Sequence, residues 1–361
     1  MEAGKGRVLC VDDEPHVVRA LHWLLRKDFE VHTTTSATEA LQVLGQHDFD
    51  VVVSDQRMPG VTGVEFLRDV RKAAPRAMRI LLTGYSDLDA MLRSVNESEV
   101  YRFVTKPWDI KALPKLIAEA VEISRSTPVV AAEREEAVPA TAIQAAESEA
   151  AQAHRPATVV LRDGESILLI DDDDGIRRTV REVLGGGVPV RHASNLAEAV
   201  HALDQAPASV VISDVRVGKV DVTRLIRLMK QKHPEVVAVV FSGVQDAQVV
   251  MDLINQGQVY RFIPKTSKPG LIRLIVDSAI KRHRQLADSP EARRRFQVEA
   301  AGEEARRSLH RDVEQSALAF AGASPGALAP AGAAGFVEEG SDEGQGFLHR
   351  ISGGFRRLFG A

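Results

Sequence analysis

Acidic, hydroxyl and lysine side chains follow short apolar runs in the first part of the chain. Asp12 and Asp13 directly follow one such run, and Asp55 follows another after a single serine. Thr83 ends a third run, and Lys106 follows a later, weaker one. Carboxylates that lie close together can bind a hard divalent cation through oxygen, and Mg²⁺ suits such a site. One carboxylate could then attack a phosphoryl group whose oxygens contact the cation, the hydroxyl and the ammonium group.

The same residue types recur 159 positions later. Asp12 and Asp171 differ by 171 − 12 = 159, and the string VNESEVYRF (95–103) aligns with INQGQVYRF (254–262) at the same offset. A constant offset over so long a span indicates two tandem copies of one domain rather than a solenoid. The second set of candidate residues is Asp171, Asp172, Asp214, Ser242 and Lys265.

Each copy alternates short apolar runs with amphipathic stretches. In the first copy the clearest runs are 8–11, 51–53 and 80–82. Continuous apolar runs are typical of parallel strands that are covered on both faces. About five β/α units in each copy predict an α/β fold with a doubly wound sheet. Because ligands bind outside the carboxyl ends of such strands, we expect the candidate side chains to converge at that edge.

Changes in composition divide the chain into five predicted segments. A stretch rich in alanine, glutamate and proline separates the two copies, and its few large apolar groups favour a mobile linker. A charged helix and then a disordered tail are expected after the second copy. The predicted segments are 6–125 and 165–285 for the two copies, 126–164 for the linker, 286–320 for the charged helix and 321–361 for the tail.

Composition excludes several classes of protein. The chain has 361 residues, with 46 Lys and Arg against 50 Asp and Glu, so a general nucleic-acid binder is not expected. A single cysteine, Cys10, excludes an internal disulfide and a cysteine-rich zinc site. The longest apolar stretch, 236–241, is far below the ~18–20 residues of a membrane helix. The apolar run 8–11 is too short for a signal-peptide core. We therefore expect a cytoplasmic protein.

Four strings of the first copy resemble receiver domains of two-component response regulators. They are VDDEP, VVVSDQRMPGVTG, LLTGYSD and YRFVTKPWD. The first copy is especially similar to the receivers of hydrogenase-type transcriptional regulators and of receiver-linked cyclic-dinucleotide phosphodiesterases. The resemblance implies a flavodoxin-like, five-stranded parallel sheet with the strand order 2-1-3-4-5 in each copy.

The resemblance also implies a role for each candidate residue of the first copy. Asp55 would accept a phosphoryl group from a phosphohistidine of a histidine kinase or a histidine phosphotransfer protein. Asp12 and Asp13 would hold Mg²⁺ together with Asp55. Thr83 and Lys106 would bind the phosphoryl group and signal its presence. The domain would catalyse only its own phosphorylation and dephosphorylation.

The second copy keeps the five residue types but departs from the family pattern around them. Its counterpart of SDQRMPG is SDVRVGK, which lacks the Met-Pro-Gly turn, and its counterpart of TKPW is PKTS. The lysine–proline bond of the family is usually cis, whereas Lys265 precedes Thr266. We expect either a trans bond with altered geometry or a tolerated strain at Lys265. In such domains the hydroxyl moves toward the phosphoryl group and an aromatic residue of the last strand reorients. Phe103 and Phe262 match the position of that aromatic residue.

Three functions are compatible with these features. The first is a phosphorelay response regulator that accepts phosphoryl groups on Asp55 and Asp214 and acts through contacts with a downstream protein. The second is a signalling scaffold in which the second copy is a non-switching pseudo-receiver. The third, a phosphatase with an aspartate nucleophile, rests on the string ILLIDDDDG and leaves Asp55 unexplained. We find no helix-turn-helix region, kinase core or phosphohydrolase motif after residue 285.

The C-terminal string GFLHRISGGFRRLFGA combines apolar and basic residues. Its apolar side chains fall near one helical face, but Gly353 and Gly354 are expected to break the helix. Such a segment could dock on a protein partner or on an anionic membrane surface.

Overall fold

The structure is a computed structural model. Its contacts divide into two compact units. The structure describes residues 4–84, 98–126, 160–185, 187–218, 220–243, 247–257, 259–290, 293, 302–323 and 342–359.

The first sheet has five parallel strands in the order β2-β1-β3-β6-β7. This is the order 2-1-3-4-5 that the family resemblance implies. In the register of the sheet Asp55 lies beside Leu82, and Thr83 lies beside Thr105, so both candidate residues stand at the carboxyl ends of strands. The strands are β1 (Gly6–Val11), β2 (Phe29–Thr34), β3 (Val51–Asp55), β6 (Met78–Thr83) and β7 (Arg102–Thr105).

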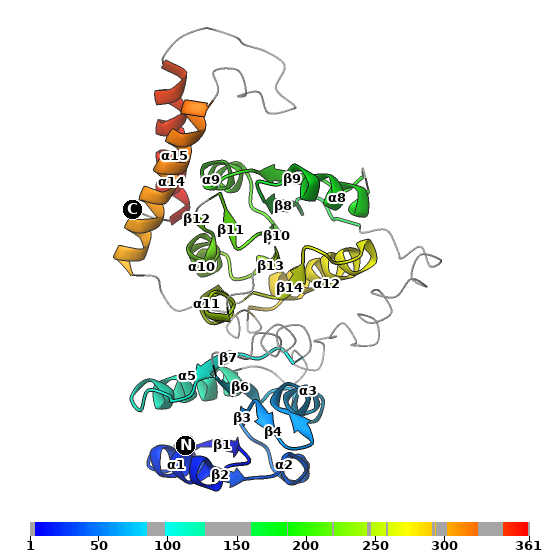
Figure 1. Cartoon of the computed structure of the whole chain (residues 1–361), viewed down its shortest axis with the longest axis vertical. Coiled ribbons are helices and arrows are strands. Elements are labelled where there is room, and N and C mark those ends of the chain that lie inside the picture. Colours follow the sequence, from blue (N-terminus) through cyan, green and yellow to red (C-terminus); the bar gives the residue numbers. More distant parts are fainter. Residues whose placement is uncertain are drawn as a thin grey trace. The chain divides into compact units, whose positions relative to one another are not determined.

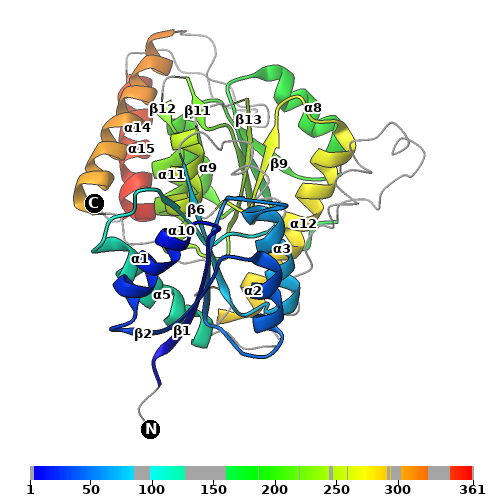
Figure 2. The ribbon, with the colours of Figure 1, turned by 60° about the horizontal axis from the view of Figure 1, so that its bottom comes forward.

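Helices cover both faces of the first sheet. Figure 2 shows α1 (Pro15–Leu25) and α5 (Ala112–Ser126) on one face, and α2 (Ala37–Leu44) and α3 (Gly63–Ala73) on the other. Two short strands, β4 (Arg57–Met58) and β5 (Val61–Thr62), form an antiparallel turn before α3. The core under α1 and α5 includes Val8, Cys10, Leu21, Val53, Ile80 and Ile117.

The second sheet repeats this topology with the order β9-β8-β10-β13-β14. In Figure 1, α8 (Asp174–Leu184) and α12 (Pro269–Asp288) lie on one face, and α9 (Leu196–Gln205) and α10 (Thr223–Lys232) lie on the other. The next helix along the chain is α11 (Ala247–Gly257). The strands are β8 (Ile167–Ile170), β9 (Val190–Ala193), β10 (Val210–Ser213), β13 (Val237–Ser242) and β14 (Arg261–Pro264), with a short pair, β11 (Arg216–Val217) and β12 (Val220–Asp221).

The expectation of a disordered tail is wrong for the last segment. The chain forms α14 (Glu303–Ala323) and α15 (Asp342–Phe359), which lie side by side and pack on α9 and α10 (Figure 1). Ile351, Phe355 and Phe359 are buried. Burying such side chains gains roughly 1.5–3 kcal/mol each, which outweighs the ~1 kcal/mol that each helical glycine costs. The helix therefore continues through both glycines, and its apolar face packs within this chain.

Two other predicted segments are only partly covered by the structure. Most of the linker 126–164 lies outside the described residues. The charged helix predicted from residue 286 corresponds to α14, while residue 286 itself belongs to the end of α12. Among the described residues, no helix is long and apolar enough to span a membrane.

Candidate functional site

Three of the predicted residues meet at the carboxyl edge of the first sheet. Lys106, which follows β7, places its ammonium nitrogen 2.6 Å from Asp12 Oδ2 and pairs also with Asp55 Oδ1. The three residues lie up to 94 positions apart. The parallel sheet brings them together because Asp55 ends β3, while Asp12 and Lys106 directly follow β1 and β7. The edge therefore holds one ammonium group between two carboxylates.

Burial strengthens the charge interactions at this edge. The side chain of Asp12 is fully buried, and its Oδ1 accepts a hydrogen bond from the Glu14 backbone N–H at 3.0 Å. Burial raises the pKa of Asp12, and the hydrogen bond from Lys106 partly offsets that effect. Burial alone would lower the pKa of Lys106, but its hydrogen bonds to Asp12 and Asp55 raise it overall. Lys106 therefore stays charged near neutral pH.

The loop after Asp55 holds this carboxylate from the other side. The backbone N–H of Arg57 donates to Asp55 Oδ2 at 2.5 Å. A Cβ atom at Gly63 would lie 2.1 Å from the Asp55 carbonyl oxygen, so only glycine lets α3 start this close to the strand. Thr83 is buried and donates to the Gly84 carbonyl oxygen at 3.2 Å. The loop therefore holds one carboxylate oxygen of Asp55 while the other pairs with Lys106.

The second copy builds the same arrangement despite its altered loops. Lys265 Nζ lies 2.9 Å from Asp171 Oδ2 and 2.6 Å from Asp214 Oδ2. Burial raises the pKa of Asp171 as it does that of Asp12. The Ser242 hydroxyl donates to Asp214 Oδ1. Of the described peptide bonds, Lys106–Pro107 is cis and the bond after Lys265 is not, yet Lys265 still reaches both carboxylates.

The remaining predicted residues complete the comparison of the two edges. Asp13 and Asp172 follow Asp12 and Asp171, and both are partly or fully exposed. Phe103 and Phe262 are buried, with 3% and 4% of their surface exposed. These aromatic side chains therefore point into the fold rather than into solvent.

The donor set of each edge fits Mg²⁺, although the lysine now occupies the space between the carboxylates. Oxygen ligands from one or two carboxylates are what Mg²⁺ uses in proteins. In the described part of the chain, no three acidic, imidazole or thiol groups are arranged as a ready-made metal cluster. Asp12, Asp13 and Asp55 would hold the cation in the first copy, and Asp171, Asp172 and Asp214 in the second.

A comparison with protein families identifies both copies. The model of the response regulator receiver domain matches residues 8–118 and 167–277, which together make up more than half of the chain. The chain belongs to the response regulator receiver domain family. We call the two matched ranges receiver 1 (8–118) and receiver 2 (167–277) below.

Individual relatives match one receiver-sized segment. The hydrogenase transcriptional regulatory protein HoxA of Cupriavidus necator is 41% identical over 122 residues, which is 34% of this chain and 25% of HoxA. Sensor kinase CckA of Brucella abortus is 34% identical over 126 residues, which is 33% of this chain and 13% of CckA. This chain therefore spans a quarter or less of these two relatives. A solved receiver domain of an HD domain-containing protein from Pseudomonas fluorescens Pf-5 is 32% identical, covers 35% of this chain and 93% of that chain, and has a TM-score of 0.34.

The string ILLIDDDDG, on which the phosphatase hypothesis rests, spans β8 and the start of α8. Asp173 caps α8, because its Oδ1 accepts the Gly175 backbone N–H at 2.7 Å. Asp171 pairs with Lys265. The phosphatase hypothesis stays a prediction.

Sequence reasoning missed one contact at the second edge. The backbone N–H of Gly218 donates to Asp172 Oδ2 at 3.0 Å. The signal was present in the sequence, since receiver 2 lacks the proline of the Met-Pro-Gly turn.

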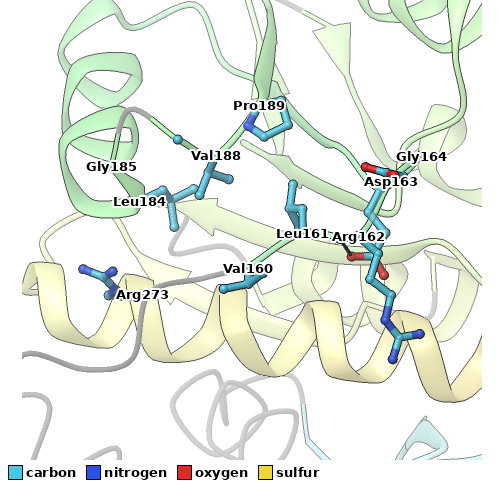
Figure 3. A pocket seen from close by; sticks show the side chains of 12 residues that line it. Val160, Leu161, Arg162, Asp163, Gly164, Leu184, Gly185, Val188, Pro189 and Arg273 are labelled. Carbon is cyan, nitrogen blue, oxygen red and sulfur yellow. Dashed lines mark hydrogen bonds between the residues drawn. The ribbon is translucent and has the colours of Figure 1, made fainter.

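A separate pocket of about 650 Å³ lies in the second unit (Figure 3). It is lined by residues 160–165, which precede β8, by the connection from α8 to β9, and by Arg273 of α12. Residues that precede parallel strands belong to the amino edge of the sheet, so this pocket is at the opposite edge from Asp171. None of the predicted site residues lines it.

Proposed function

We propose that this chain is a phosphorelay response regulator that accepts phosphoryl groups on Asp55 and Asp214. The observation that carries the proposal is the lysine that joins a buried aspartate to the aspartate ending the third strand, built twice in one chain. A phosphohistidine of a histidine kinase or a histidine phosphotransfer protein would be the donor. In this proposal the chain catalyses only its own phosphorylation and dephosphorylation, and it is located in the cytoplasm.

The chemistry follows from the groups at each edge. An Asp55 carboxylate oxygen forms a bond to phosphorus as the bond from phosphorus to the donor imidazole nitrogen breaks, which yields an acyl phosphate and free histidine. Lys106 balances the negative charge on the phosphoryl oxygens, and the Thr83 hydroxyl is the nearby donor for one of them. When bound, Mg²⁺ would neutralise further charge on these oxygens.

Output would come from protein–protein contacts rather than from nucleic-acid binding. The formal charge of −4 gives no general attraction to polyanions. A phosphoryl group adds negative charge beside Lys106 and Thr83, and this local change would bias a two-state surface that a downstream protein reads.

Labelling with a small phosphodonor tests the proposal. The full chain is incubated with acetyl phosphate and Mg²⁺, and the incorporated phosphoryl groups are counted by intact mass. We expect two groups per chain, one fewer in Asp55→Asn or Asp214→Asn, and none in the double variant. Asp69→Asn, a change at a partly exposed residue of α3, is the matched control and should keep both groups. Unchanged labelling of Asp55→Asn would refute the site.

The scaffold hypothesis remains the second candidate, for receiver 2 alone. It is favoured by the internal hydrogen bonds that Asp172 and Asp214 already make. In that case the unmodified chain takes up one phosphoryl group. Asp214→Asn then leaves the number of phosphoryl groups per chain unchanged at any Mg²⁺ concentration.

A further inference from the structure

The two receivers differ in the backbone hydrogen-bond donor that lies beside their second acidic residue. In receiver 2 the turn between β11 and β12 reaches the acidic edge, where the Gly218 N–H donates to Asp172 Oδ2 at 3.0 Å. Gly218 has a φ of +63°, a conformation that glycine adopts without strain. The turn is therefore built so that a backbone donor faces a carboxylate proposed as a cation ligand.

Receiver 1 cannot make this hydrogen bond. The position equivalent to Gly218 is 218 − 159 = 59, where the chain has Pro59, and proline has no backbone N–H. The positive φ of the first turn lies one residue later, at Gly60, with a value of +82°. The equivalent of Asp172 is Asp13, since 172 − 159 = 13, and the turn beside it offers no amide at position 59. Loss of the Met-Pro-Gly turn thus places a backbone N–H donor beside the acidic residues of receiver 2.

The proposed phosphoacceptor accepts a backbone N–H in both receivers, and in receiver 2 it also accepts a side-chain hydroxyl. Asp214 Oδ1 accepts the Ser242 hydroxyl and the Val215 backbone N–H, the latter at 2.6 Å. In receiver 1 the corresponding hydroxyl, that of Thr83, donates to the Gly84 carbonyl oxygen instead. Protein groups therefore bind carboxylate oxygens of both Asp172 and Asp214.

We propose that the Gly218 amide competes with the divalent cation for Asp172, so that receiver 2 binds Mg²⁺ more weakly than receiver 1. The hydrogen bond from Gly218 takes up a lone pair of Asp172 Oδ2 that a cation could otherwise use, and a proline at this position would remove that donor. The net contribution of a typical solvent-exposed hydrogen bond corresponds to a factor of about three to ten in affinity. The inference rests on the cation site of the proposed function. It adds that the cation affinity of receiver 1 exceeds that of receiver 2.

Titration of the full chain with Mn²⁺ measures the effect at each receiver. Free Mn²⁺ is counted by its electron paramagnetic resonance signal, because carboxylate sites that take Mg²⁺ also take Mn²⁺. Asp13→Asn removes a carboxylate ligand of the first site, so the Mn²⁺ binding that remains is that of receiver 2. In that background residues 217–219 are replaced by Met-Pro-Gly, and we expect Mn²⁺ affinity to rise about three- to tenfold. The reciprocal exchange of residues 58–60 for Val-Gly-Lys, in an Asp172→Asn background, should lower the affinity of receiver 1.

A second readout needs no change to the turn. In the unmodified chain with ¹⁵N-labelled glycine, the Gly218 amide resonance should move on addition of Mg²⁺ and its proton should exchange faster. This readout decides the matter if the exchanged turn impairs folding.

The outcomes separate this inference from the proposed function. A second site that binds Mn²⁺ equally well before and after the exchange, or a Gly218 resonance that ignores Mg²⁺, overturns the inference and leaves the function intact. Absence of Mn²⁺ binding at both receivers overturns the cation site and the inference together.

Discussion

Two equivalent carbonyl oxygens each accept a hydrogen bond from a buried cation, but different elements supply it. In receiver 1, Arg79 of β6 donates Nη1 to the Ala77 oxygen at 2.9 Å. In receiver 2 the residue equivalent to Arg79 is Ala238, and Lys230 of α10 donates Nζ to the Val236 oxygen at 2.7 Å. The two copies therefore conserve a hydrogen bond while exchanging the side chain that makes it.

The buried amine of Lys230 makes the stability of the second unit depend on pH. Burial and, to a smaller extent, the nearby Arg282 together lower the pKa of Lys230 from 10.5 to about 7. Between these values the unfolded chain binds more protons than the folded chain, so stability should rise as the pH rises from 7 towards 10. The slope is at most ~1.4 kcal/mol per pH unit for one group. Urea unfolding followed by pulse proteolysis measures it.

Lys230→Met should remove this dependence. The methionine keeps most of the apolar volume and does not titrate, although the Val236 oxygen loses its donor. Lys281→Met, an exposed change on α12, is the matched control and should keep the slope of the unmodified chain. A slope that persists in Lys230→Met would assign the pH dependence to another group.

The residues at the acidic edges could be predicted from the sequence, whereas these buried cations could not. Asp12 and Lys106 follow strands, and any side chain at the carboxyl end of a parallel strand lies at the same edge. Arg79 lies inside β6, which begins two residues before the apolar run 80–82 that marks it in the sequence. A charge inside a strand has no periodicity signal, because its burial depends on carbonyl groups that only the folded chain places around it.

At the scale of elements, α15 shows why local preference misled the prediction for the tail. Gly353 and Gly354 disfavour a helix by propensity alone, but a larger residue at Gly354 would make a tight contact where the helix meets α9. A Cβ atom there would lie 3.1 Å from Asp204 Oδ2. Asp204 is held by Arg357, whose Nε lies 2.9 Å from Oδ1. The glycine that weakens the isolated helix thus permits its packing.

Two alanine substitutions separate packing from propensity in α15. Gly353→Ala has only Arg357 Nη1 near its new Cβ, at 3.5 Å, and should stabilise the helix by up to ~1 kcal/mol. Gly354→Ala must displace the Asp204 carboxylate, and we expect its stability to fall at least ~1 kcal/mol below that of Gly353→Ala. Urea unfolding of the second unit measures both. Equal stabilities would show that Gly354 does not limit the packing of α15 on α9.

At the scale of the whole molecule, one chain carries two acidic edges with the same residue types and different surroundings. Receiver 1 keeps the family turn after Asp55, whereas receiver 2 replaces it and gains hydrogen bonds to its own carboxylates. A shared donor would then load the two sites in an order set by the cation rather than by the acceptor aspartates. The sequence predicts both acceptor aspartates because the same residue types surround them. It does not predict the order in which they are phosphorylated, because that order depends on a backbone amide.

Phosphorylation at graded Mg²⁺ concentrations tests this order in the full chain. With acetyl phosphate in excess, Asp55 should be labelled at the lower Mg²⁺ concentrations and Asp214 at concentrations about three- to tenfold higher, following the difference in cation affinity. Peptide mass spectrometry after borohydride trapping distinguishes the two aspartates. Replacing residues 217–219 by Met-Pro-Gly should bring the two labelling curves together, whereas Asp69→Asn should leave both in place. If both aspartates are half-labelled at the same Mg²⁺ concentration in the unmodified chain, the Gly218 amide does not order the two receivers.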